Sequence, residues 1–115
     1  MNTYVLQFSH LTPNQIGAVH EGDKPFMLNY FSPNLNSYLK ESDYLMGKMA
    51  SSYLINFCRS GDPNGKDLPI WKKSTEDRTF FELGDNPQMK TFDSNKYKKI
   101  FEKLKEKQQL DFIDE

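Results

Sequence analysis

The chain has 115 residues and a mass of 13.5 kDa, which is enough for one domain with a modest core. Its 15 basic and 16 acidic side chains leave a formal charge of -1, so no charge excess favours nucleic acid or an anionic membrane. Its apolar runs fall far short of the roughly 18 residues that a membrane span needs. The single cysteine, Cys58, excludes an internal disulfide and a cysteine-based metal site.

The N-terminal part predicts a strand followed by a loop that carries a histidine. Residues 4–8 are short, aromatic and β-branched, as strands are. In the loop 17–23, His20 follows small residues, which let the backbone turn tightly and leave the imidazole room to reach outward. An imidazole exchanges protons near neutral pH, so His20 suits general acid–base work. Spacing alone favours the other interpretation, a bystander in a surface loop. The remaining histidine, His10, we expect to be solvated at the end of the strand.

Two helices of different strength are expected next. Asp23 and Pro25 predict a short helix, with Asp23 as its N-cap and the proline in the first turn, where a missing N–H costs nothing. The stronger helix runs from about Asp43 to Arg59, capped by Ser42, and ends where Gly61 can adopt a left-handed conformation. One face of it is apolar, which predicts a core rather than a cofactor site; its members are Met46, Met49, Ala50, Tyr53, Leu54 and Phe57.

The C-terminal part predicts an anchor, a hairpin and a last helix. Residues 61–65 form a compound turn, and Leu68-Pro69-Ile70-Trp71 is an apolar anchor. The runs 78–83 and 88–92 predict two strands of a hairpin. A helix from about Asn95 to Gln109 carries a narrow stripe formed by Tyr97, Ile100, Phe101 and Leu104. Six lysines cover the rest of this helix, but Glu102 and Glu106 interleave with them, so we expect a solvated face rather than a nucleic-acid site.

We therefore expect one domain, divided into consecutive segments. They are a strand and histidine loop (1–31), a linker (32–41), a helix (42–60), a turn and tryptophan anchor (61–77), a hairpin (78–92) and a C-terminal helix (94–110). The N-terminus, Met1-Asn2-Thr3, lacks the charged and apolar regions of a signal peptide, which favours a cytoplasmic location.

Several of these stretches, in this order, resemble the C-terminal end of the type-B carboxylesterases, the cholinesterase-like branch of the α/β-hydrolases. The most specific part is the succession of the helix ending in Asn56-Phe57, then Gly61-Asp62-Pro63-Asn64, then Leu68-Pro69-Ile70-Trp71. The resemblance covers roughly the first 90 residues. It implies an α/β-hydrolase fragment with short strands, about three helices and an incomplete sheet, which looks α+β in isolation.

The resemblance also implies a role for His20. In that family the histidine of this loop is the third member of a serine–acid–histidine triad, and it moves a proton from the serine to the leaving alcohol. Three neighbours depart from the family pattern: Glu21 replaces a glycine, Asp23 replaces a glutamate, and Lys24 replaces an apolar residue. The family's chemistry needs no metal or organic cofactor, so we expect none.

The other parts of such an enzyme are missing from this sequence. It contains no Gly-x-Ser-x-Gly nucleophile elbow, since the frame from Gly61 to Gly65 has Pro63 at its centre, and no glycine-rich oxyanion loop. We therefore expect the chain to be inactive as an esterase by itself, with an ester substrate only if the N-terminal portion is supplied. In the family, the strand 4–8 joins a large sheet, so here it should lack an obvious partner. Exposed strand edges and apolar surface predict self-association.

The alternative is a noncatalytic protein-interaction module related to the esterase fold. The substitutions at Glu21 and Lys24 favour it. A metal site has no support, because His10, His20 and Cys58 lack the spacing of a ligand set.

Overall fold

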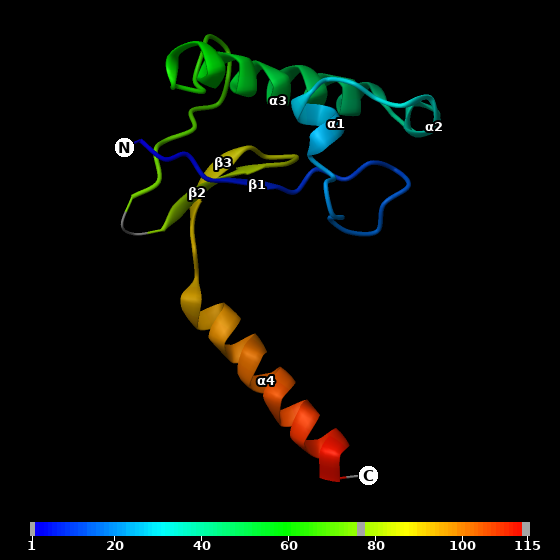
Figure 1. Cartoon of the computed structure of the whole chain (residues 1–115), viewed down its shortest axis with the longest axis vertical. Helices are drawn as coiled ribbons and strands as arrows, with labels where there is room; N and C mark the ends of the chain where they lie inside the picture. The colour runs from blue at the N-terminus through cyan, green and yellow to red at the C-terminus, as the bar shows by residue number, and fades with distance from the viewer. Residues whose placement is uncertain (1, 76–77, 114–115) are drawn as a thin grey trace.

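A computed structural model describes residues 2–75 and 78–113, with side chains as far as residue 108, so the end of the expected 61–77 segment lies outside the described residues. Three strands form one small sheet, a long helix lies across it, and a second long helix stands away from both (Figure 1). In chain order the elements are β1 (Leu6–Phe8), α1 (Lys24–Met27), α2 (Pro33–Asn36), α3 (Glu41–Ser60), β2 (Thr79–Leu83), β3 (Gln88–Thr91) and α4 (Ser94–Ile113). The fold is thus a fragment of α and β elements around an incomplete sheet.

The sheet has the order β1-β2-β3. The expected hairpin is present, because β2 and β3 pair antiparallel. The expectation that the first strand has no partner in this chain is wrong: β1 pairs in parallel with β2, with Leu6 opposite Phe81 and Phe8 opposite Leu83. A parallel pair needs a long crossover, and the segment through α1, α2 and α3 supplies it. Among the described residues, the outer edges of β1 and β3 both lack a partner strand.

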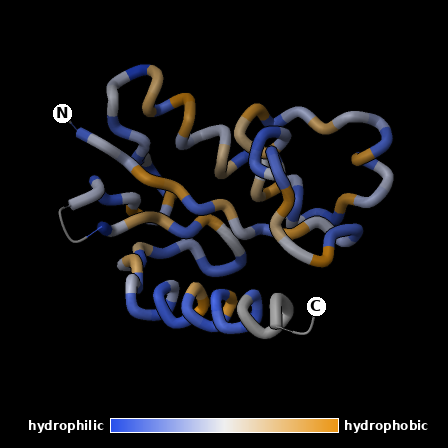
Figure 2. The backbone as a smooth tube through the Cα atoms, turned by 60° about the horizontal axis from the view of Figure 1, so that its bottom comes forward, coloured by the Kyte–Doolittle hydropathy of each residue, from blue (hydrophilic) through white to orange (hydrophobic). Residues whose placement is uncertain are grey.

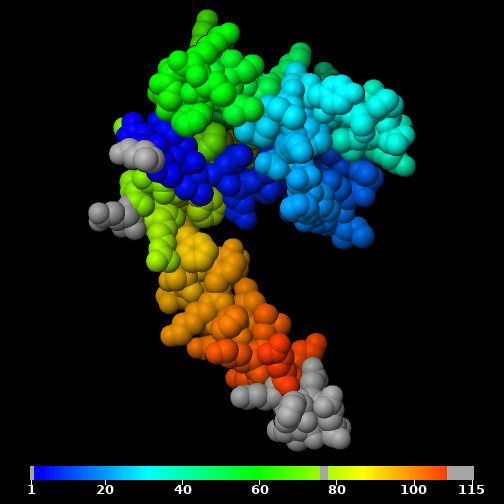
Figure 3. Space-filling view, viewed as in Figure 1, coloured from blue at the N-terminus to red at the C-terminus, as the bar shows by residue number. Residues whose placement is uncertain are grey.

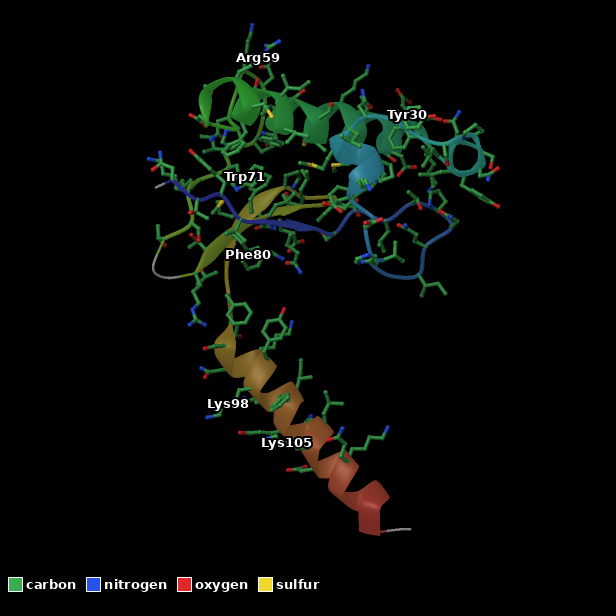
Figure 4. The ribbon with its side chains drawn as sticks, viewed as in Figure 1. Tyr30, Arg59, Trp71, Phe80, Lys98 and Lys105 are labelled. Atoms are coloured by element: carbon green, nitrogen blue, oxygen red, sulfur yellow. The ribbon has the colours of Figure 1, made fainter. Side chains whose placement is uncertain are left out.

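The core lies between α3 and one face of the sheet. Along β2, Phe81 and Leu83 are fully buried while Phe80 and Glu82 are only partly so, as the two-residue period of a strand requires. Trp71 stacks on Phe81, with ring centroids 5.5 Å apart. Figure 4 shows Trp71 between α3 and the sheet, and Phe80 on the side of the sheet away from α3. The buried apolar residues are Phe26, Met46, Ala50, Tyr53, Trp71, Phe81 and Leu83.

The long helix α3 begins earlier than expected. Its N-cap is Lys40 rather than Ser42, and Asp43, at the third helical position, accepts a hydrogen bond from the Lys40 backbone N–H at 2.7 Å. The carboxylate therefore folds back over the first turn and satisfies an N–H that a helix start leaves unpaired, which moves the start two residues upstream. The predicted end is correct: Gly61 closes the helix with a φ of 76°.

The segment before α3 is more regular than expected. Helix α1 follows Asp23 and contains Pro25, as predicted, although the Asp23 side chain makes no capping hydrogen bond. Part of the expected linker is helical, because Ser32 caps α2 by accepting a hydrogen bond from the Leu35 N–H. The chain after α1 passes close over α3 at Gly47, where an added Cβ would lie 2.8 Å from the Asn29 side-chain oxygen. Glycine at this position leaves room for the Asn29 and Phe31 side chains.

Helix α4 extends away from the rest of the chain (Figures 1 and 3). Most of its residues are hydrophilic, and apolar residues recur along it (Figure 2). These are the predicted stripe, whose four side chains are 46–60% exposed: Tyr97, Ile100, Phe101 and Leu104. Its first turn is joined to the body by Tyr97, which stacks on Phe92 at 4.8 Å. Within the described residues, no helix is long and apolar enough to cross a membrane.

The chain is more open than an ordinary domain of its size. Its radius of gyration is 17.9 Å, where a compact domain of this length has about 13 Å. Its accessible surface is 9010 Å², where a compact monomer of this mass exposes about 6,500 Å². The surplus of about 2,500 Å² matches the area that a large protein–protein interface buries. Large apolar side chains, among them Ile16, Leu28 and Ile70, belong to the exposed surface.

Candidate functional site

The histidine loop connects β1 to α1. The sheet ends at Ser9, whose N–H donates to the Leu83 carbonyl at 3.0 Å, and the chain then leaves the sheet until α1 begins at Lys24. Inside the loop, the Gln15 N–H donates to the Thr12 carbonyl and the Gly22 N–H donates to the Val19 carbonyl. Among the described residues, the hydrogen bonds of residues 11–22 all stay within residues 11–24. The loop is thus held to the body mainly at its two ends.

His20 lies on the outer side of this loop. Its side chain is 95% exposed, and the nearest carboxylate oxygen is Glu21 Oε1, 4.0 Å from His20 Nε2. Glu21 has a φ of 57°, a left-handed conformation that glycine adopts without strain. This is the position where the resembled family has glycine, the residue best suited to such a φ. His20 is open to solvent, and no described side chain orients it by a hydrogen bond.

A hollow of about 310 Å³ lies between β1 and the histidine loop. Its walls come from the strand and from the inner side of the loop, and His20 is not among them; they are Leu6, Gln7, Phe8, His10, Gln15, Ala18, Val19, Gly22 and Asp23. The hollow borders the strand that ends the sheet, so the uncovered part of β1 and the histidine loop face the same space.

His10 is not the solvated residue that we expected. It is 8% exposed, and its Nε2 lies 2.6 Å from Oδ1 of Asp43, which is 1% exposed. The reason is tertiary: the N-terminus of α3 lies against the end of β1, where no local signal in the sequence would place it. His10 Nδ1 is buried without a hydrogen-bond partner, and the exposed Asp85 Oδ1 lies 3.7 Å from it.

The described residues do not complete a catalytic set around His20. Glu21 cannot stand in for the triad acid, because it faces Nε2, the nitrogen that exchanges a proton with the serine in such a triad. Cys58 is exposed on α3, far along the chain from the loop. In the parts of the chain that are described, no three His, Cys, Asp or Glu side chains gather in a way that could hold a metal ion. The arrangement can supply a proton-transfer group, but no nucleophile.

Comparison with known proteins places these elements in one family. Residues 1–101 match the sequence model of the Carboxylesterase family. The pyrethroid hydrolase Ces2a of Mus musculus is 30% identical over 91 residues, and the cocaine esterase of Homo sapiens is 29% identical over 92 residues. Each alignment covers 73% of this chain and 16% of the relative. The chain therefore spans about a sixth of the length of these curated relatives.

Solved structures agree on the fold. An esterase from Clostridium hathewayi that hydrolyses aliphatic aromatic polyesters superposes with a TM-score of 0.67 and 27% identity, covering 78% of this chain and 19% of that one. A carboxylesterase from Geobacillus stearothermophilus has a TM-score of 0.65 and 23% identity, covering 78% and 20% of the two chains. The β1–loop–α3–hairpin arrangement is thus that of a part of an α/β-hydrolase esterase.

Proposed function

Because the chain belongs to the carboxylesterase family, we propose that it is the C-terminal part of a carboxylic ester hydrolase and that His20 is the triad histidine. The observation that carries the proposal is the place of His20 in a loop that follows a parallel strand of the sheet and precedes α1. Triad histidines of α/β-hydrolases come last along the chain, after the serine and the acid. A segment from the C-terminal end would therefore contain the histidine alone.

In this proposal His20 acts as the proton carrier of the reaction. Its imidazole takes the proton of a serine hydroxyl as that serine attacks the ester carbonyl, and it returns the proton to the leaving alcohol. The serine, the acid and the oxyanion donors come from the portion of the enzyme that this sequence lacks. His20 is 95% exposed, which is consistent with a side chain whose contacts come from those groups. By itself the chain should hydrolyse no ester beyond the slow background of any free imidazole.

A graft tests this role. Residues 1–101 replace the matching C-terminal portion of the Clostridium hathewayi esterase, and ester turnover and labelling by a serine-directed phosphonate are measured. We expect the graft to be active, and His20→Ala to lower kcat by about a thousandfold or more, as removal of a triad member does. Ile16→Ala, a change at a fully exposed loop residue, is the control and should leave turnover unchanged. A folded, active graft that does not respond to His20→Ala would refute the role.

The isolated chain supplies the second part of the test. We expect no phosphonate labelling of the natural sequence. Stoichiometric labelling that disappears in His20→Ala would mean that a serine of this chain is activated, and the inactivity of the isolated chain would then be wrong.

A noncatalytic interaction module is the second candidate, and the surplus of about 2,500 Å² of accessible surface favours it. We propose that the isolated chain associates with a second copy through the outer edge of β1 and its uncovered apolar surface. An unpaired strand edge offers backbone donors and acceptors to another strand. Light scattering over a range of concentrations should give a mass above 13.5 kDa, with binding of a hydrophobic dye that falls as the mass rises. A monomer that binds no dye would refute association.

A further inference from the structure

His10 lies where the two ends of the histidine loop meet. Its ring packs edge to face on Phe8, at the end of β1, with a centroid distance of 6.1 Å. It packs in the same way on Phe26 of α1, at 5.1 Å. Phe8 and Phe26 are themselves in contact, with centroids 5.1 Å apart. His10, at the start of the loop, therefore contacts both the strand from which the chain leaves and the helix to which it returns.

A buried carboxylate holds His10 in this place. Asp43 Oδ1 is hydrogen-bonded to His10 Nε2. Asp43 Oδ2 accepts a hydrogen bond from the Lys40 backbone N–H at the start of α3. Both oxygens are thus used, and the carboxylate is fixed to the first turn of a 20-residue helix. A buried polar pair is costly to break, because the group left behind loses its partner away from water. The ends of the loop are thereby attached to α3 as well as to each other.

We propose that His10 and Asp43 are a positioning pair for the histidine loop: they fix its two ends against α3 and so set where His20 is presented. This inference rests on the proposed catalytic role of His20. Neither residue contacts the reacting atoms in this proposal. The loop itself needs such a device, because its own hydrogen bonds join only residues 11–24 to one another.

The test compares two carboxylates that flank the same imidazole. In Asp43→Asn the amide has one acceptor oxygen, so either the His10 ring or the Lys40 N–H loses its acceptor. Asp85→Asn is the matched control, because Asp85 lies 3.7 Å from the other ring nitrogen and its side chain is fully exposed. Backbone amide exchange is followed by NMR at Gln15 and Gly22 in the loop, with Phe81 in β2 as the reference.

We expect Asp43→Asn to accelerate exchange at Gln15 and Gly22 at least tenfold more than at Phe81, and Asp85→Asn to change none of the three. Equal acceleration at all three sites would show general destabilisation and overturn the proposal, as would an unchanged loop or an equal effect of Asp85→Asn. If Asp43→Asn does not fold, the test is made on the natural protein, by recording the imidazole ¹⁵N NMR signals of its two histidines. His10 Nε2 must then carry a hydrogen-bonded proton, and its absence would overturn the pair.

The outcome is separable from that of the catalytic proposal. His20→Ala should leave the exchange rates at Gln15 and Gly22 unchanged, because the exposed His20 ring holds nothing in the loop. In the active graft, Asp43→Asn should lower kcat at least tenfold, and Asp85→Asn should not. A graft whose kcat is unchanged by His20→Ala would refute the catalytic role. The amide exchange measurements would still test the His10–Asp43 pair.

Discussion

The division of the sheet into a covered and an uncovered face can be tested with two neighbouring phenylalanines. Phe81 is fully buried, stacks on Trp71 at 5.5 Å and meets Tyr53 edge to face at 5.6 Å. Truncation of a buried phenylalanine to alanine costs about 3–5 kcal/mol. Phe80, one residue earlier, is only partly buried on the opposite face, so the same change should cost about 1 kcal/mol or less.

These costs are large relative to the stability of the chain. A protein of this length has a free energy of unfolding of roughly 6–17 kcal/mol, and a core of seven buried apolar residues places this one toward the lower end. With a denaturant dependence of about 2 kcal/mol per molar urea, Phe81→Ala should lower the unfolding midpoint by about 2 M and Phe80→Ala by about 0.5 M or less. At the lower end of that range the natural chain should unfold at about 3 M urea and Phe81→Ala at about 1 M.

The assay is urea unfolding followed by fluorescence of Trp71, the only tryptophan, at several protein concentrations. Trp71 lies against Phe81, so its emission reports on the covered face directly. Equal midpoint shifts for the two variants would refute the assignment of the faces. A Phe80→Ala shift that grows with protein concentration would instead show that a second copy covers the outer face.

Four further outcomes are expected. Glu21→Gly should raise the free energy of unfolding by about 1 kcal/mol, because it relieves the φ of 57°, whereas Glu21→Ala should not; equal urea midpoints would count against strain there. Burial raises the pKa of Tyr53 to about 12, so the contribution of Tyr53 to stability should be constant below pH 10 and be lost between pH 10 and 12, a loss that Tyr53→Phe should abolish. The hydrogen bond from Lys90 lowers the pKa of Glu82, so its contribution is present above about pH 4.5 and lost on acidification, and Glu82→Gln should flatten that acid limb in unfolding curves. Deleting residues 94–115 should change the free energy of unfolding by less than about 1 kcal/mol, since α4 is joined to the body mainly by the stack of Tyr97 on Phe92; a larger calorimetric change would mean that α4 is packed in solution.

Local patterns predicted the elements well. The stop of α3 at Gly61, the hairpin and the stripe of α4 all depend on spacing within one element, and the structure has each of them. The predicted core face of α3 is correct in part, because Met46, Ala50 and Tyr53 are buried while Phe57 is exposed. The family resemblance depended on the same kind of information, since it rests on the order of short stretches along the chain, and the match over residues 1–101 confirms it. The placement of His20 in the loop before α1 was also readable from neighbouring residues.

The errors about His10 and β1 share one cause, which is contact between residues far apart in the chain. His10 looked solvated, but it is hydrogen-bonded to Asp43, 33 residues away. The strand β1 looked unpartnered, because its partner lies more than 70 residues downstream. The starts of α2 and α3 were missed for a local reason, since Ser32 and Asp43 each accept a hydrogen bond from a backbone N–H three residues away.

The sequence by itself determined which segments are helix, strand and turn, and to which family the chain belongs, because propensity, capping and hydrophobic period act within a few residues. Only the tertiary structure decided that His10 is buried and His20 exposed. The residues beside each histidine give no sign of its burial. The environments of the two histidines differ because the start of α3 lies against His10, whereas His20 is left in solvent. Burial depends on packing between elements, so a pattern within one short segment does not predict it.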